Sequence, residues 1–172
     1  MGFCNVSQTF PAMSVAFTKE GDSEAFAADL PDRPISTHPN LVTPDGLAAI
    51  EHELATARAA YASAQSAGGA ADGDRTAMAR ATRDLRYWSA RRATAQVLDR
   101  DPSKSVVQFG DRVTFEREDG RVQTFRIVGE DQADPAKGSV SYVAPIARAL
   151  LGKAVGDVSA APGGEIEITA IE

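Results

Sequence analysis

The sequence predicts an α+β protein in which an antiparallel helical hairpin precedes a small antiparallel sheet with one helix. Two matched apolar seams on either side of a glycine-containing break at residues 68–73 predict the hairpin. Beyond residue 105 the apolar spacing changes to the alternation typical of strands, and Asp119-Gly120 separates two such runs. The 172 residues suffice for one ordinary domain or two small ones.

Charge is unevenly distributed along this acidic chain. The formal net charge is −6, yet residues 75–100 carry seven arginines against only Asp84 and Asp99. A basic segment in an acidic protein favours one face that meets an anionic partner. The alternative is a solvated helix face, because arginine is a good helix former.

The composition excludes several function classes. The single cysteine, Cys4, leaves no internal disulfide and fits a reducing compartment, so we expect a cytoplasmic protein. Neither His38 nor His52 has Cys or acidic partners at ligand spacing, and no phosphate loop or nucleophile–base pair can be assembled. No apolar run approaches the ~20 residues of a membrane span. We therefore expect no enzyme activity of its own, no stable metal or cofactor, no small-molecule substrate and no membrane partner.

The N-terminal arm, residues 1–42, is predicted to be flexible and acidic. Residues 1–45 carry two bases against six acids, and "DLPDRPISTHPN" combines three prolines with few apolar residues. Such a composition is typical of an extended or disordered segment.

Residues 43–100 are predicted to form the coiled-coil hairpin, with its tip near residues 68–76. Thr43 is a plausible N-cap, and Pro44 suits the first helical position. A first helix from Asp45 to Ala67 would be about 34 Å long at 1.5 Å per residue. The seam residues are spaced by three and four: Leu47, Ile50, Leu54, Ala57, Tyr61 and Ala64, then Met78, Ala81, Leu85, Trp88, Arg92 and Ala95.

Residues 104–172 are predicted to form the sheet domain after the polar boundary "DRDPSKS". Strands are expected at 112–118 and 121–129, joined by a two-residue Asp-Gly turn, with a further short strand at 138–143. Pro145 opens a helix that ends at Gly152, and residues 161–171 provide a turn and the last strand.

The stretch "RIVGEDQADPAKGSVSYVAPIARALLGKAVGDV", residues 126–158, resembles the C-terminal domain of the bacterial Gre transcript-cleavage factors. Gln132 stands where the family has an acid, and Ala144 stands where it has a serine. "TPDGLAAIEHEL" and "ATAQVL" are similar to the start and end of the family's coiled coil, so the likeness covers residues 43–172. The resemblance implies an FKBP-like fold for the C-terminal domain.

The resemblance also implies a partner and a mechanism. Gre factors bind bacterial RNA polymerase: the C-terminal domain sits at the mouth of the secondary channel and the coiled coil reaches down it. Acidic residues at the tip help to hold a second Mg²⁺ in the polymerase active site, which then hydrolyses backtracked RNA. The polymerase is the nuclease, and the factor, which we expect to be monomeric, is an accessory protein.

Gre tips often read Gly-Asp-x-Ser-Glu-Asn, whereas this chain has "GDRTAM" at 73–78. Asp74 matches the first essential acid, Ala77 replaces the second, and Asp72 could substitute from the other side of Gly73. The hairpin is also about one heptad per helix shorter than the family norm, a shortfall of about 10 Å. Weak or absent stimulation of RNA cleavage is therefore predicted.

Further contacts follow from the resemblance. Contacts to polymerase or nascent RNA are expected from the arginines of the second helix, namely Arg75, Arg80, Arg83, Arg86, Arg91 and Arg92. Docking of the C-terminal domain on polymerase is expected at Asp131, Asp134, Pro145 and Arg148.

Two alternatives stay open. The chain is also similar to the regulator of nucleoside diphosphate kinase, a Gre relative with a shortened coiled coil that binds polymerase. An FKBP-like fold alternatively suggests a prolyl isomerase or peptide-binding module, although fold alone does not carry activity.

Overall fold

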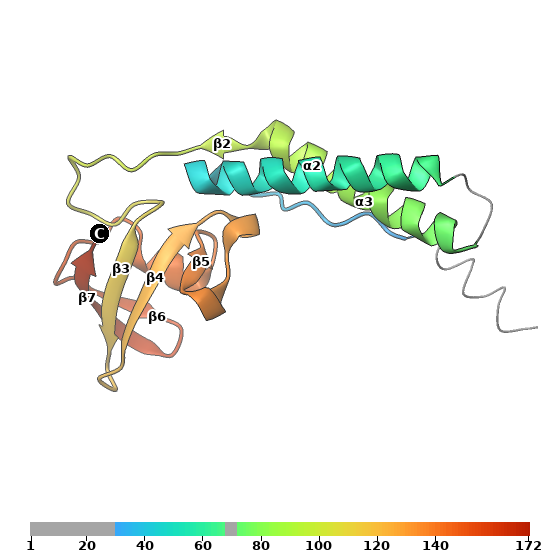
Figure 1. Cartoon of the computed structure of the whole chain (residues 1–172). Coiled ribbons are helices and arrows are strands. Elements are labelled where there is room, and N and C mark those ends of the chain that lie inside the picture. The colour runs from blue at the N-terminus through green and yellow to red at the C-terminus, as the bar shows by residue number, and fades with distance from the viewer. Residues whose placement is uncertain (1–29, 68–71) are drawn as a thin grey trace, which may run out of the picture.

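The computed structural model describes residues 30–67 and 72–172. Figure 1 shows a long helical hairpin that projects to one side of a curled sheet domain. The tip is described only in part, since residues 68–71 and the side chains of residues 72–74 lie outside the described part. No helix of the described residues is long and apolar enough to cross a membrane.

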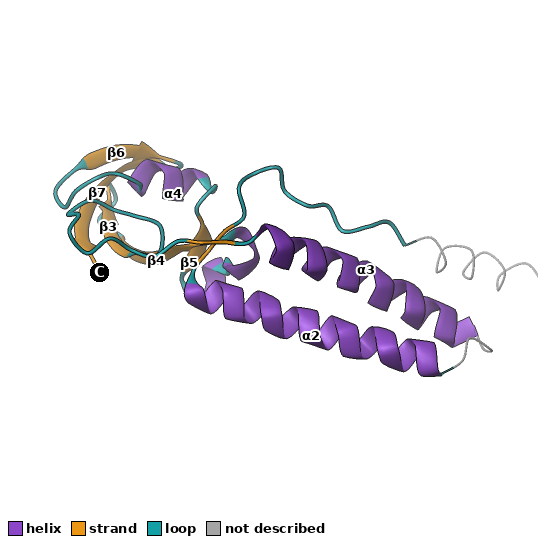
Figure 2. Ribbon diagram, turned by 90° about the horizontal axis from the view of Figure 1, so that it is seen from above, coloured by secondary structure: helices purple, strands orange, loops and turns teal. Residues whose placement is uncertain are grey.

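The hairpin consists of α2 (Pro44–Ser66) and α3 (Asp72–Thr94). The predicted start of α2 is confirmed: Thr43 Oγ1 accepts a hydrogen bond of 3.0 Å from the Gly46 backbone N–H, and Pro44 follows directly. The predicted seam of α2 faces inward, with Ile50, Leu54 and Ala57 buried. The two helices lie side by side along their lengths (Figure 2).

The seam of α3 differs from the prediction at its basal end. Ala81 is buried, but the expected polar seam member Arg92 is exposed and its neighbour Arg91 is buried instead. The 3,4 repeat selected the wrong neighbour here, because burial of Arg91 depends on a partner outside the hairpin. Arg91 meets an acid of the sheet domain, described below.

The described end of the arm is extended and is held against the rest of the molecule. Residues 30–40, the arm segment, run along the hairpin, and β1 (Leu41–Val42) then pairs in parallel with β2 (Gln96–Val97). Both sides of the hairpin base are thereby tied together before the chain enters the sheet domain.

The sheet domain has five strands in the order β5-β4-β3-β7-β6. One strand differs from the antiparallel prediction: β5 runs parallel to β4, because two 3-10 turns, η1 (Glu130–Gln132) and η2 (Pro135–Lys137), carry the chain back before β5 begins. The strands are β3 (Arg112–Arg117), β4 (Val122–Val128), β5 (Ser139–Ser141), β6 (Val158–Ala161) and β7 (Gly164–Ile171).

The β3–β4 turn is one residue longer than predicted. The Arg117 N–H donates to the Arg121 carbonyl at 3.0 Å, which leaves Glu118–Gly120 as the loop. Gly120 takes the left-handed φ of +79° that closes such a loop with a bulge. The Asp-Gly pair thus marks the hairpin correctly, but Glu118 joins the turn.

The core of the sheet domain lies between the sheet and α4 (Pro145–Leu150). It contains ten buried apolar side chains: Val107, Phe109, Val113, Phe115, Ile127, Val140, Ala147, Leu150, Ile166 and Ile168. Burial of these side chains supplies the main driving force for folding of this domain.

Two glycines permit the hairpin base to approach the sheet domain closely. A Cβ on Gly129, directly after β4, would lie 2.4 Å from the backbone oxygen of Leu41. A Cβ on Gly46 would lie 2.6 Å from Oε1 of Gln132, the far end of a flexible side chain. The first contact leaves no space for a side chain, whereas the second could be relieved by a rotation of Gln132.

We therefore predict that Gly129→Ala lowers the free energy of unfolding by about 1–3 kcal/mol, because overpacking displaces backbone. Gly46→Ala should cost less, since it gains up to ~1 kcal/mol of helix propensity and meets side-chain atoms of Gln132 and Thr43 rather than backbone. Urea unfolding followed by Trp88 fluorescence measures both. Equal losses for the two variants would contradict this packing.

Candidate functional site

The junction between the hairpin and the sheet domain is the most developed polar site of the described residues. Its centre is a group of three side chains that we call the clamp: Tyr87 and Arg91 on α3, and Asp131 on η1. The Tyr87 hydroxyl donates to Asp131 Oδ1 at 2.5 Å, and Arg91 Nε donates to Asp131 Oδ2. Residues four apart on α3 thus hold both oxygens of one carboxylate.

The clamp is shielded from water. The side chain of Arg91 is 3% exposed and that of Asp131 is 13% exposed, so this ion pair is the most buried of the described pairs. Burial of the Tyr87 hydroxyl, together with its hydrogen bond to the Asp131 carboxylate, raises the pKa of Tyr87 to about 12. The phenol therefore stays protonated and acts as a donor at neutral pH.

The arm segment covers the clamp. The Arg33 guanidinium lies 3.7 Å from the ring centre of Tyr87 and 5.1 Å from that of Trp88, within cation–π range. The two rings meet edge to face at 5.0 Å, although they are adjacent in sequence. Buried Asn40 donates through Nδ2 to the Arg91 carbonyl at 2.7 Å. These contacts explain why residues 30–40 are held against the hairpin.

A second set of contacts joins the start of α2 to the sheet domain. The Thr43 hydroxyl donates to Gln132 Oε1 at 2.8 Å while it caps α2. Arg126 pairs with Asp45 at 3.2 Å on the surface. Tyr142 donates to the Pro39 carbonyl at 2.5 Å. Gln132, which stands where the resembled family has an acid, thus accepts a hydrogen bond from the helix cap.

The clamp reassigns two residues that were predicted to face a partner. Arg91 was expected to contact polymerase or RNA, and Asp131 was expected to dock on polymerase. In the structure they bind each other, and their burial leaves little of either side chain for an external partner. Sequence spacing missed this pairing, because 40 residues separate the two side chains.

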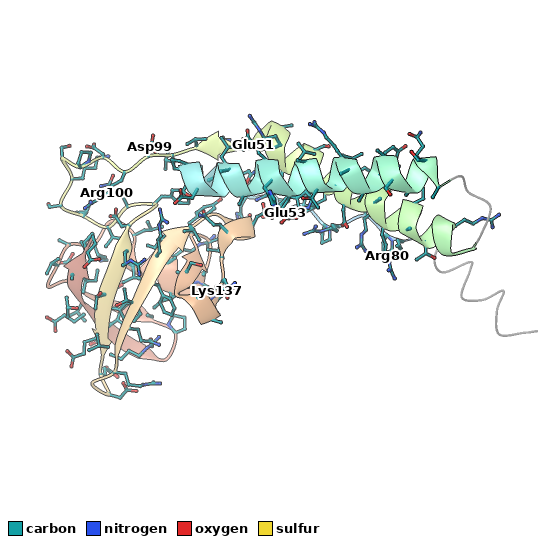
Figure 3. All side chains as sticks on the ribbon, viewed as in Figure 1. Glu51, Glu53, Arg80, Asp99, Arg100 and Lys137 are labelled. Atoms are coloured by element: carbon teal, nitrogen blue, oxygen red, sulfur yellow. The ribbon has the colours of Figure 1, made fainter. Side chains whose placement is uncertain are left out.

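The other predicted arginines of α3 remain at the surface. Arg75, Arg80, Arg86 and Arg92 are exposed, while Arg83 is half-buried. Arg86 pairs with Asp32 at 3.3 Å, and Arg92 pairs with Glu51 at 2.8 Å across the hairpin. Figure 3 shows Arg80 projecting from the distal part of α3. Arg75 and Arg80 are thus placed toward the tip end of a long surface.

The other predicted docking residues lie on two elements of the sheet domain, η2 and α4. Pro145 and Arg148 are exposed on α4, and Asp134 is half-buried at the start of η2. A hydrogen bond from Lys137 lowers the pKa of the Asp134 carboxyl. Nothing in the described contacts engages Arg148, so its guanidinium is available to an acidic partner.

The predicted metal-assisting residues Asp72 and Asp74 fall on the first turn of α3, and their side chains lie outside the described part. A carboxylate in the first turn of a helix is favoured by the helix dipole, with or without a metal. Among the described residues, no three His, Cys, Asp or Glu side chains are placed to hold a metal ion.

Comparison with known proteins identifies the sheet domain. Residues 102–172 match the family model described as "Transcription elongation factor, GreA/GreB, C-term". This part of the chain is similar to the C-terminal part of the GreA/GreB transcription elongation factors. The α+β arrangement predicted from the sequence and the resemblance to Gre factors are both confirmed.

Several curated relatives are similar to part of the chain. Transcription elongation factor GreA of Desulfovibrio desulfuricans is 42% identical over 95 residues, which are 54% of this chain and 57% of that protein. GreA of Methylococcus capsulatus is 47% identical over 92 residues, 48% of this chain and 56% of that protein. GreB of Haemophilus ducreyi is 40% identical over 76 residues, 44% of this chain and 47% of that protein. The chain spans about half the length of these relatives.

Solved structures show a looser likeness. The crystal structure of GreA factor homolog 1 (Gfh1) of Thermus thermophilus is 22% identical, with a TM-score of 0.37 over 78% of this chain and 99% of that chain. GreA/GreB from Nitrosomonas europaea gives 20% identity and a TM-score of 0.35 over 78% of this chain and 98% of that chain. Both TM-scores are low, so these superpositions carry no functional inference.

We predict that Asp131→Asn lowers the free energy of unfolding by about 3 kcal/mol, because it leaves the Arg91 charge buried without its counter-ion. The matched control is Asp45→Asn, which removes the exposed pair to Arg126 and should cost under ~1 kcal/mol. Urea unfolding curves measure both. Similar small losses would show that the clamp contributes little.

The clamp should also respond to high pH. The folded-state pKa of Tyr87, about 12, lies above the ordinary tyrosine value of 10.0, so folding favours the protonated phenol. This contribution is complete below pH ~10 and is lost as the pH rises toward about 12. The free energy of unfolding should therefore fall more steeply from pH ~10 upward in the wild type than in Tyr87→Phe. Parallel curves would contradict the assignment.

Proposed function

We propose that the protein is a Gre-type regulator of transcription elongation that binds bacterial RNA polymerase. The observation that carries the proposal is a sheet domain similar to the C-terminal part of GreA and GreB, to which a long hairpin is fixed by a buried clamp. A projecting hairpin can enter a narrow channel while the domain that carries it stays outside (Figure 1). The protein would act in the cytoplasm as a monomer.

In this proposal the hairpin enters the polymerase secondary channel. Each helix has 23 residues and is therefore about 34 Å long. Exposed arginines toward the tip, above all Arg75 and Arg80, would contact acidic polymerase surfaces or the phosphates of nascent RNA. Arg148, Pro145 and Asp134 would meet the polymerase at the channel mouth. The clamp residues would not contact polymerase, but would fix the orientation of the hairpin relative to the sheet domain.

The proposed factor is an accessory protein with weak or absent stimulation of RNA cleavage. Any Mg²⁺ would be shared with the polymerase active site. This ion requires near-octahedral oxygen ligands at about 2.1 Å. The chain offers Asp74 with Ala77 at the second acidic position of the family pattern, and Asp72 on the other side of Gly73. A displaced carboxylate on a shortened hairpin does not satisfy such a geometry.

The second candidate is a protein like the regulator of nucleoside diphosphate kinase, a Gre relative with a shortened coiled coil. The hairpin of this chain, with 23 residues in each helix, is also shorter than the Gre norm. A peptide-binding role for the sheet domain is less well supported. Of its four aromatic residues, Phe109 and Phe115 are buried in the core, and Phe125 and Tyr142 pack against that core. They do not line an open aromatic pocket.

Core bacterial RNA polymerase should retain the protein in a pull-down at micromolar concentration. Arg148→Glu should weaken binding by about tenfold or more, because it places a like charge against the acidic surface that the arginine meets. Arg121→Glu on the β3–β4 turn is the matched control and should bind normally. Failure of the wild type to bind would refute the proposed function.

Backtracked elongation complexes test the prediction about cleavage. The wild-type protein should shorten the RNA little beyond the intrinsic rate of polymerase, and Asp72→Ala and Asp74→Ala should behave like the wild type. RNA shortening that disappears in Asp74→Ala would show that the tip holds the metal after all.

A further inference from the structure

The distal half of the hairpin carries a groove that the clamp and the arm segment leave uncovered. It lies between α2 and α3, has a volume of about 530 Å³ and is lined mainly by alanines of both helices. Arg80 and Asp84 line it from α3. Small side chains on both walls leave room for a further chain segment, and Arg80 adds a positive charge.

The arm segment leads along α3 in the direction of this groove. Asn40 contacts Arg91 near the base of α3, Arg33 lies over Tyr87 and pairs with Asp84, and Asp32 pairs with Arg86. As the arm is followed backwards from residue 40 to residue 32, its contacts on α3 move from Arg91 to residues 84–87, toward the tip. Leu30, half-buried, is the first residue described.

Two cations of α3, Arg80 and Arg83, lie within one helical turn of Asp84. Arg80 is exposed and shares a helix stripe with Asp84, Tyr87 and Arg91, which are spaced by four, three and four. Arg83 Nε is buried without a hydrogen-bond partner among the described residues; Asp84 Oδ1 is 3.6 Å away, too far for a hydrogen bond.

We propose that residues 20–29 occupy this groove as an intramolecular cover of the distal hairpin. The segment reads "EGDSEAFAAD": four acids, Glu20, Asp22, Glu24 and Asp29, surround Phe26 and three alanines. Its acids complement Arg80, which lines the groove, and its apolar residues suit the alanine walls. The seven positions from Asp84 to Ala77 span about 10 Å of helix, a distance that about four extended residues cover. The chain is therefore long enough to reach.

Such a cover would compete with the polymerase channel for the same hairpin surface, a consequence that rests on the proposed function. The acidic segment would take the place of the anionic partner of Arg80 until the hairpin inserts. The intramolecular contact itself does not depend on polymerase.

Carbodiimide cross-linking tests the contact directly. Arg80→Lys supplies an amine in the groove, and Arg58→Lys supplies one on an exposed position of α2 as the matched control. If residues 20–29 occupy the groove, their carboxylates have a high effective concentration around the amine at position 80. Peptides that join position 80 to residues 20–29 should therefore exceed those that join position 58 by about tenfold. In the Arg80→Lys chain, a product between the new amine and Asp84, one helical turn away, shows that the reagent has reacted.

Two outcomes would overturn the proposal. One is equal yields at positions 80 and 58, or none at position 80 while the Asp84 product forms. The other is a product that appears only between two chains, which would make a second copy the occupant.

The competition is tested separately. A chain that lacks residues 1–29 should bind core polymerase several-fold more tightly than the full chain. Unchanged affinity, with the cross-link present, would refute the competition and leave both the contact and polymerase binding intact.

Discussion

The Asp131 carboxylate, bound by Tyr87 and Arg91, fixes the relation between the two parts of the molecule. An unpaired charge at such a buried position would be costly, so Arg91 and Asp131 each require the other, and the Tyr87 hydroxyl satisfies the second carboxylate oxygen. The close backbone approach at Gly129 and the Thr43–Gln132 hydrogen bond hold the start of α2 against the same domain. Both helices are thereby attached to the sheet domain, through different contacts.

This double attachment has a functional consequence. A hairpin that swings freely on its domain would lose orientational freedom on entry into a channel, and that loss would reduce affinity. A hairpin held by buried contacts has already lost this freedom on folding. In the proposed function, the clamp thus contributes to polymerase binding without touching polymerase, and the surface arginines of α3 contribute through direct contact.

The sequence predicted the local structure well and the tertiary contacts poorly. Thr43 and Pro44 located the start of α2, and the 3,4 spacing located the seam of the hairpin, because caps and periodicity are local properties. The spacing placed Arg92 in the seam, whereas Arg91 is the buried residue, since its burial arises from an acid 40 residues away. The parallel β5 was missed because its direction depends on the turns η1 and η2. The requirement for glycine at position 129 could not be predicted from the sequence, because it arises from a tertiary contact with the backbone of Leu41.

The central claim, that the clamp sets the direction of the hairpin, can be tested by measuring a distance between the two parts. Nitroxide labels on Arg58→Cys and Val122→Cys, both exposed positions, in a Cys4→Ser background would report it by double electron–electron resonance. If the clamp sets the direction of the hairpin, the labelled chain should give one narrow distance distribution, and addition of Asp131→Asn should broaden it. A broad distribution in both proteins, or a narrow one in both, would contradict it.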